Sequence, residues 1–256
     1  MNNLLSNKNI LVAGAGGLLG SRIVKNALEQ GASVLAVDND YNKMKELLSS
    51  IEINIDSPNI KLIELNIADE KSVKSLFSNI DYIDGAVNST YPRNNTYGAH
   101  FFDVTLASFN ENLAIHLGSA FLFSQQCAAY FEIKKTPFSL VNISSIYGVI
   151  APDFSIYENT PMTMPIEYAA IKSGLLHINK YISKYVNNSN FRVNAVSPGG
   201  IFDSQPESFL EAYKAKTLGA GMLDVQAIIG SIMFFLSDQS KYVVAQNLIV
   251  DDGFSL

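Results

Sequence analysis

The feature that most constrains the fold is a regular alternation of short, mostly apolar runs with longer segments of helical periodicity. Each run is too short for a helix and ends next to glycine, aspartate, asparagine or serine, so we interpret the runs as buried strands. The seven predicted strands are residues 9–13, 33–37, 61–65, 85–88, 139–143, 191–196 and 247–250. Because strands that alternate with helices form a parallel sheet covered on both faces, the sequence predicts a doubly wound α/β fold.

One domain is predicted over residues 1–256, because we find no linker, internal repeat or low-complexity tract. A hydrophobic content of 48% with 16% charged residues is typical of a compact globular protein. The net charge of −6 gives no basic footprint for nucleic acid. The single cysteine, Cys127, excludes an internal disulfide and a cysteine-based zinc site, so no metal is expected. We recognise no signal peptide and no bilayer-spanning stretch, and therefore expect a cytoplasmic protein without membrane contact.

A glycine-rich loop joins the first predicted strand to the first predicted helix. Its glycines Gly14, Gly17 and Gly20 follow the pattern G-x-x-G-x-x-G, with Leu18 and Leu19 before the last of them. Glycines let the backbone approach a pyrophosphate, and the N–H groups at the start of the helix face the anion. The alternative is a tight strand-to-helix connection without a ligand. The strand before the loop and the helix after it favour a dinucleotide cofactor in a Rossmann-type fold.

Asp38 favours NAD over NADP as that cofactor. It ends the second predicted strand, about 20 residues beyond the glycine loop, where a carboxylate accepts hydrogen bonds from the adenosine ribose. The same carboxylate would repel a 2′-phosphate, and neither the glycine loop nor residues 38–40 contain a basic residue. The alternative role for Asp38 is to cap the helix predicted from residue 41, but Asp40 fills that role better.

Tyr168 and Lys172 lie four residues apart in a predicted helix, and therefore on the same face. An ammonium group beside a phenol lowers the pKa of the phenol, which makes tyrosine usable as a general acid or base. The alternative is one face of an ordinary amphipathic helix. Ligands of parallel sheets bind at the carboxyl ends of the strands. We expect one site there, because the following all lie at or just after the ends of predicted strands: the glycine loop, Asp38, Asn66, Asn88, Ser145 and Pro198.

Motifs of a known family occur in their usual order along nearly the whole chain. They are the glycine loop, Asn66-Ile67, Val87-Asn88, Val141–Ser145, Tyr168–Lys172, Arg192–Gly199 and Val250–Gly253. In this order and spacing they resemble the short-chain dehydrogenase/reductase family. The resemblance implies an NAD-dependent oxidoreductase that interconverts a secondary alcohol and a ketone.

The resemblance also assigns roles to individual residues. It makes Tyr168 the general acid/base, while Lys172 lowers its pKa and holds the nicotinamide ribose. It gives Ser145, with Ser144 as the alternative, a hydrogen bond to the substrate oxygen. The further cofactor contacts that it implies are Asn66 and Ile67 at the adenine, Asn88 and Ser89 at the ribose, and Pro198 and Ile201 at the nicotinamide amide.

The chain departs from the family pattern in three places. Leu18 stands where most members carry their second glycine. The 23-residue step from Ser145 to Tyr168 is long, and we expect substrate-loop insertions at about residues 147–165 and 201–221. His116 stands in the helix predicted over Leu106–Phe131, at the position of an asparagine that holds a relay water; Asn112 lies one turn earlier. His116 is either a neutral imidazole that holds this water or a core histidine.

The loop N-S-T-Y-P-R-N at residues 88–94, with the insertion at 147–165, is similar to bacterial family members of flagellin-modification and sialic-acid-like sugar pathways. This similarity implies a sugar derivative as the substrate. Within the loop, Arg93 is a candidate to pair with a phosphate or carboxylate of that substrate. The alternative is an ordinary surface arginine.

The chain is expected to form a homodimer or a homotetramer. The family forms homodimers and homotetramers through the helix over 106–131 and the helix that carries Tyr168, and both are rich in apolar residues here.

The competing function is a catalytically impaired, dinucleotide-binding protein of the same family. His116 and Leu18 are the features that suggest it, whereas the intact Ser145, Tyr168 and Lys172 favour the enzyme.

Overall fold

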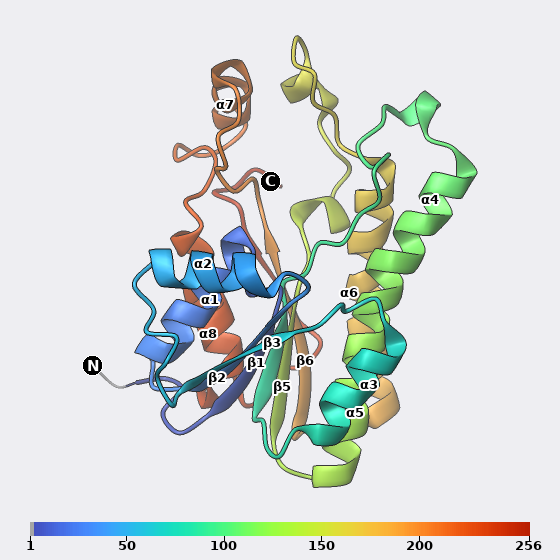
Figure 1. Cartoon of the computed structure of the whole chain (residues 1–256). Helices are drawn as coiled ribbons and strands as arrows, with labels where there is room; N and C mark the ends of the chain where they lie inside the picture. Colours follow the sequence, from blue (N-terminus) through green and yellow to red (C-terminus); the bar gives the residue numbers. More distant parts are fainter. Residues whose placement is uncertain (1–2) are drawn as a thin grey trace.

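The computed structural model describes residues 3–256, which contain one sheet of seven parallel strands (Figure 1). The strands are β1 (Asn9–Ala13), β2 (Ser33–Asp38), β3 (Ile60–Glu64), β4 (Gly85–Asn88), β5 (Phe138–Ile143), β6 (Phe191–Pro198) and β7 (Asn247–Val250). Their spatial order is β3-β2-β1-β4-β5-β6-β7. The predicted doubly wound α/β fold is confirmed, and each strand boundary lies within two residues of its prediction.

Helices cover both faces of the sheet. They are α1 (Leu18–Glu29), α2 (Tyr41–Ser50), α3 (Glu70–Asn79), α4 (Leu106–Asn112), α5 (Gly118–Lys134), α6 (Ile166–Val186), α7 (Glu207–Lys214) and α8 (Gln226–Leu236). One apolar core joins α1, α2 and α8 to one face, and another joins α3, α5 and α6 to the other (Figure 1). No helix within residues 3–256 is long and apolar enough to cross a membrane.

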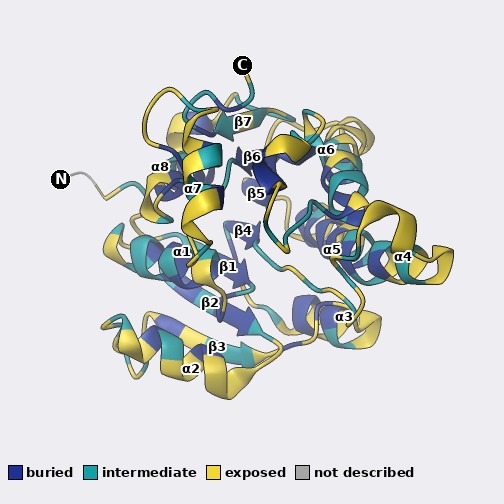
Figure 2. Ribbon diagram, turned by 90° about the horizontal axis from the view of Figure 1, so that it is seen from above, coloured by how far each residue is buried: buried dark blue, intermediate teal, exposed yellow. Residues whose placement is uncertain are grey.

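The strand sequences follow from this layering. Every residue of β4, β5 and β6 is buried, since helices cover these central strands on both sides (Figure 2). Continuous apolar runs are the pattern of such strands. The edge strands β3 and β7 are partly exposed, and accordingly they carry polar residues such as Lys61 and Asn247.

The helix predicted over Leu106–Phe131 is wrong in one respect, because it is not continuous. α4 ends at Asn112, a π-turn follows at Leu113–Leu117, and α5 then runs on to Lys134. π-turns widen a helix locally and are frequent at functional sites. The π-turn here carries His116.

The two segments predicted as loop insertions lie beyond the carboxyl ends of the strands (Figure 1), and their side chains pack against each other. The rings of Tyr157 and Phe209, one from each segment, lie 5.2 Å apart. Lys216 Nζ also lies 2.9 Å from the carboxylate of Asp153. The two segments therefore form one lobe, which we call the upper lobe, over the edge of the sheet where ligands of this fold class bind.

A buried arginine ties β6 to the end of α8. Arg192 is 7% exposed, and its guanidinium donates to the carbonyl oxygens of Phe235 (3.0 Å), Ser237 (3.2 Å) and Ser240 (3.0 Å). It thereby adds charged donors to the carbonyl groups at and just after the end of α8, a region where helical carbonyls lack intrahelical partners. A charged residue is thus compatible with a central strand.

Replacing Arg192 by methionine is expected to lower the free energy of unfolding by about 2–3 kcal/mol, because three buried carbonyls each lose a hydrogen bond from a charged donor. Urea denaturation followed by circular dichroism measures the change. Arg192→Lys keeps the charge but offers a single donor group, and should give an intermediate value. A midpoint for Arg192→Met equal to that of the wild type would show that these hydrogen bonds contribute nothing net.

Candidate active site

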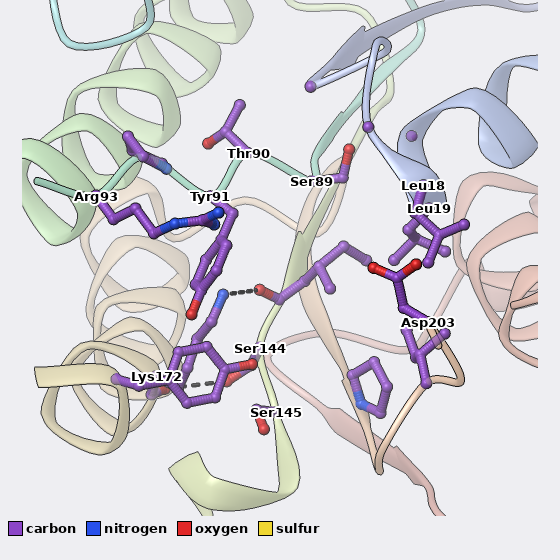
Figure 3. A pocket seen from close by; sticks show the side chains of 18 of the residues that line it. Leu18, Leu19, Ser89, Thr90, Tyr91, Arg93, Ser144, Ser145, Lys172 and Asp203 are labelled. Carbon is purple, nitrogen blue, oxygen red and sulfur yellow. Dashed lines mark hydrogen bonds between the residues drawn. The ribbon is translucent and has the colours of Figure 1, made fainter. Parts of the chain in front are cut away.

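A cleft of about 990 Å³ opens at the carboxyl ends of the strands, below the upper lobe (Figure 3). The predicted site residues that line it are Gly14, Gly17, Leu18, Leu19, Asp38, Asn66, Ile67, Ser89, Ser145, Tyr168, Lys172, Pro198 and Ile201. The upper lobe contributes further side chains, among them Tyr157, Asp203 and Tyr213. Residues spread over most of the sequence are therefore brought together in one place.

Asn88 is the exception among the predicted cofactor residues. Its side chain is 5% exposed and does not line the cleft. The Oδ1 atom of Asn88 instead accepts hydrogen bonds from the backbone N–H of Thr90 (3.2 Å) and from its hydroxyl (2.7 Å). The side chain of Asn88 therefore shapes the loop after β4, and its contact with the ribose stays a prediction.

The glycine loop follows β1. The strand order of the sheet changes direction between β1 and its neighbour β4, so the loop lies at this switch point. Gly14 has φ +85°, and a Cβ atom there would lie 2.9 Å from the carbonyl carbon of Ser89. A Cβ atom on Gly20 would lie 1.9 Å from the carbonyl oxygen of Gly14. α1 begins at Leu18 without a side-chain cap, so the N–H groups of its first turn are available to an anion. The loop therefore has the close packing and the donors of a phosphate cradle.

Asp38 lies at the side of this loop. Its Oδ2 atom accepts a hydrogen bond from the backbone N–H of Gly16 at 2.8 Å. The alternative role as helix cap falls to Asp40, whose Oδ1 atom accepts from the N–H of Lys43 at 2.9 Å. The Oδ1 atom of Asp38 accepts from the backbone N–H of Asp40 at 3.3 Å, and its carboxylate lines the cleft.

The two serines after β5 have different partners. The hydroxyl of Ser144 is 2% exposed and donates to the carbonyl oxygen of Lys172 at 3.0 Å. Ser145 instead accepts a bond from the N–H of Tyr147 at 3.2 Å and interacts with the hydroxyl of Tyr168. Since the proton of Ser144 is committed to α6, the geometry favours Ser145 as the serine that faces a substrate.

Tyr168 and Lys172 lie one turn apart on α6, as predicted. Burial raises the pKa of Tyr168, although the hydrogen bond with Ser145 opposes this effect. The Lys172 ammonium lies 5.4 Å from the Tyr168 ring centroid and donates to the carbonyl oxygen of Ile143 at 2.9 Å. Burial lowers the pKa of Lys172 to about 8. In the protein alone, burial therefore outweighs the expected lowering of the Tyr168 pKa by Lys172.

The structure distinguishes His116 from Asn112. Asn112 is fully buried and pairs with Asn94: its Oδ1 accepts from the N–H of Asn94 (3.0 Å), and its Nδ2 donates to the Asn94 side chain (3.1 Å). The ring of His116 is buried against Tyr91, which lines the cleft, and its Nδ1 atom has no hydrogen-bond partner among the described residues. Burial, together with the nearby charge of Lys172, lowers the pKa of His116 to about 2, so its imidazole is neutral.

Tyr91 is the site residue that sequence reasoning missed. Its ring packs edge-on against the rings of Tyr168 (5.6 Å between centroids) and His116 (5.3 Å), and its hydroxyl bonds to that of Tyr97 (2.8 Å). Figure 3 shows Tyr91 between Arg93 and the Lys172 side chain. The signal in the sequence was the position of Tyr91, an aromatic residue three positions after the end of β4, which lies beside β1 in the sheet.

Two comparisons with known proteins match nearly the whole chain. The sequence model of the family described as enoyl-(acyl carrier protein) reductase matches residues 14–255. A protein of Campylobacter coli named post-translational flagellin modification protein A is 37% identical over 258 residues, which cover 99% of this chain and 100% of that protein.

Two solved structures show the same fold. A short-chain dehydrogenase from Leptospira borgpetersenii with bound NAD+ superposes with a TM-score of 0.86 at 29% identity, covering 100% of this chain and 95% of that one. A gluconate 5-dehydrogenase from Burkholderia cenocepacia, in complex with NADP and tartrate, has a TM-score of 0.84 at 18% identity, with 99% and 97% coverage. At this identity the second structure is evidence for the fold alone.

Proposed function

Because this chain belongs to the short-chain dehydrogenase/reductase family, we propose that it is an NAD-dependent oxidoreductase that interconverts a secondary alcohol and a ketone. The observation that carries the proposal is the convergence of Ser145, Tyr168 and Lys172 in the cleft that also contains the glycine loop. Acid/base groups beside a dinucleotide cradle are what hydride transfer to or from a carbinol carbon requires.

The residues at the glycine loop fit a dinucleotide. The close packing of Gly14 against Gly20 leaves no room for side chains, and the first turn of α1 offers its N–H groups to a pyrophosphate. Asp38 would hold the adenosine ribose, Asn66 and Ile67 the adenine, and Lys172 the second ribose. When bound, NAD accepts or returns a hydride at its nicotinamide ring.

The chain's own residues would handle the proton and the charge on the substrate oxygen. Tyr168 takes the hydroxyl proton during oxidation and returns it during reduction. Ser145 donates a hydrogen bond to the same oxygen and stabilises the charge that develops there. Lys172, whose ammonium lies 5.4 Å from the Tyr168 ring centroid, favours the phenolate form of Tyr168 while it is charged.

The pathway proposal rests on the Campylobacter coli relative, whose name refers to flagellin modification. We propose a sugar derivative in flagellin or surface-glycan modification as the substrate of the present chain.

We also propose a homo-oligomer, since α5 and α6 expose apolar side chains such as Ile133 and Tyr185. Sedimentation analysis tests the oligomeric state, and an exclusively monomeric protein would contradict it.

NAD is expected to bind at least about tenfold more tightly than NADP, because the carboxylate of Asp38 repels a 2′-phosphate. Calorimetric titration of both cofactors measures the ratio. Asp38→Asn should reduce the preference, since it removes the charge and keeps the shape. Asp40→Asn is the matched control: it removes the neighbouring charge, which caps α2, and should preserve the preference. Tighter binding of NADP by the wild type would contradict the assignment.

A further inference from the structure

The loop after β4 carries a cation into the cleft. The guanidinium carbon of Arg93 lies 5.0 Å from the centroid of the Tyr91 ring, and both residues line the cleft. Tyr91 in turn packs edge-on against Tyr168 at 5.6 Å. One aromatic ring therefore separates the guanidinium from the proposed general acid/base, and Figure 3 shows the Arg93 side chain extended along Tyr91.

Both ends of this loop are held by buried asparagines. On the β4 side, Asn88 accepts two hydrogen bonds from Thr90. On the α4 side, Asn94 exchanges two hydrogen bonds with Asn112, which is fully buried. The backbone that carries Arg93 is thus fixed on the rigid part of the fold, which is what a specific binding group requires.

The charge of Arg93 is not neutralised within the protein. None of the ion pairs found among residues 3–256 includes Arg93. Lys172, whose ammonium lies 5.4 Å from the centroid of the Tyr168 ring, is by contrast already bonded to the carbonyl oxygen of Ile143. A guanidinium presents its donors in a planar fork that matches phosphate and carboxylate oxygens.

We propose that Arg93 binds an anionic group of the substrate, a phosphate or a carboxylate, a few bonds away from the carbon that is oxidised or reduced. The proposal rests on the function proposed above, because Tyr168 and Ser145 hold the reacting oxygen. Tyr91 is a positioning residue: its ring supports the guanidinium and sets its spacing from Tyr168. The substrate class is then hydroxylated phosphates and acids, such as sugar phosphates and sugar acids, rather than uncharged alcohols.

A binding experiment tests Arg93 without turnover. The protein is first mixed with excess NAD, so that the glycine loop does not compete for anions, and is then titrated with inorganic phosphate or acetate in a calorimeter. Arg93→Gln is expected to weaken binding of the preferred anion by about tenfold, and Arg93→Lys by less. Lys241→Gln removes an exposed positive charge outside the cleft and should have no effect.

A kinetic experiment identifies the anion. Hexose 6-phosphates, hexonates and uncharged hexoses are compared as substrates by NADH production. Turnover of a charged sugar is expected. Turnover of hexose 6-phosphates would identify the anion as a phosphate, and turnover of hexonates would identify it as a carboxylate. Arg93→Gln should then raise KM by about tenfold and change kcat little, while NAD affinity stays the same.

Two results would overturn the role of Arg93: equal anion affinity in the wild type and Arg93→Gln, or turnover confined to uncharged sugars. The difference between these two proteins reports on Arg93 whether or not NAD binds. Absence of NAD binding in the wild type would instead overturn the proposed function, so the two failures are distinguishable.

Discussion

Replacing Tyr168 by phenylalanine is expected to reduce NAD-linked turnover by about a thousandfold, within the range that proton transfer by a positioned side chain contributes. The substitution removes one oxygen atom from a half-buried ring whose neighbours Tyr91 and Lys172 contact the ring itself. Packing is therefore preserved, and NAD affinity should change little. Steady-state kinetics with the best substrate of the sugar panel, together with calorimetric NAD titration, measures both quantities.

Tyr185→Phe is the matched control for this experiment. Tyr185 lies on the same helix, α6, is 79% exposed and stacks only on Tyr181 in the set of aromatic contacts within residues 3–256. Its loss of a hydroxyl should leave turnover unchanged. If Tyr168→Phe keeps wild-type turnover, Tyr168 is not the acid/base. If the wild type binds NAD but turns over no alcohol or ketone, the catalytically impaired binding protein becomes the better description.

Replacing Gly20 by alanine is expected to abolish NAD binding within the measurable range and to destabilise the fold by about 2–3 kcal/mol. A Cβ atom at this position would lie 1.9 Å from the carbonyl oxygen of Gly14 and 2.7 Å from its carbonyl carbon. Both atoms belong to the backbone and cannot rotate away. α1 would have to move from β1, and its first turn would leave the place where a pyrophosphate is held.

Gly230→Ala is the matched control: it is the same substitution, but it is expected to raise the stability of the protein. Gly230 lies within α8, is exposed, and a Cβ atom there would meet nothing within 4 Å. This substitution should stabilise the protein by about 0.5–1 kcal/mol, because alanine favours the helix. Thermal unfolding and NAD titration of both variants make the comparison. Normal NAD affinity in Gly20→Ala would show that the glycine loop is not the cofactor cradle.

Sequence patterns identified the fold because the relevant signals are local. An apolar run of four to eight residues reports burial on both faces of a sheet, and polar residues after each run mark the edge where ligands bind. The same locality made Asp40 recognisable as the cap of α2, since its partner Lys43 is three residues away. Tyr168 and Lys172 were recognisable for the same reason: a helix places residues four apart on one face.

The choice between neighbouring candidates was decided only by tertiary contacts. Ser144 and Ser145 are equivalent in sequence, but the hydroxyl of Ser144 donates to the backbone carbonyl oxygen of Lys172, 28 residues away. Asn112 and His116 are one turn apart, yet Asn112 is engaged by Asn94 while the π-turn directs His116 toward Tyr91. Sequence spacing does not encode which of two adjacent side chains meets a distant partner.

The sequence by itself thus determined the parallel sheet, the glycine loop and the Tyr168–Lys172 pair, because each depends on residues a few positions apart. The tertiary structure alone decided that the side chain of Asn88 bonds to Thr90 and that burial raises the pKa of Tyr168. It also decided that the guanidinium of Arg93 lies over the ring of Tyr91 in the cleft. The physical reason is that burial and side-chain contacts arise from segments that folding brings together, whereas strand and helix patterns arise from near neighbours along the chain.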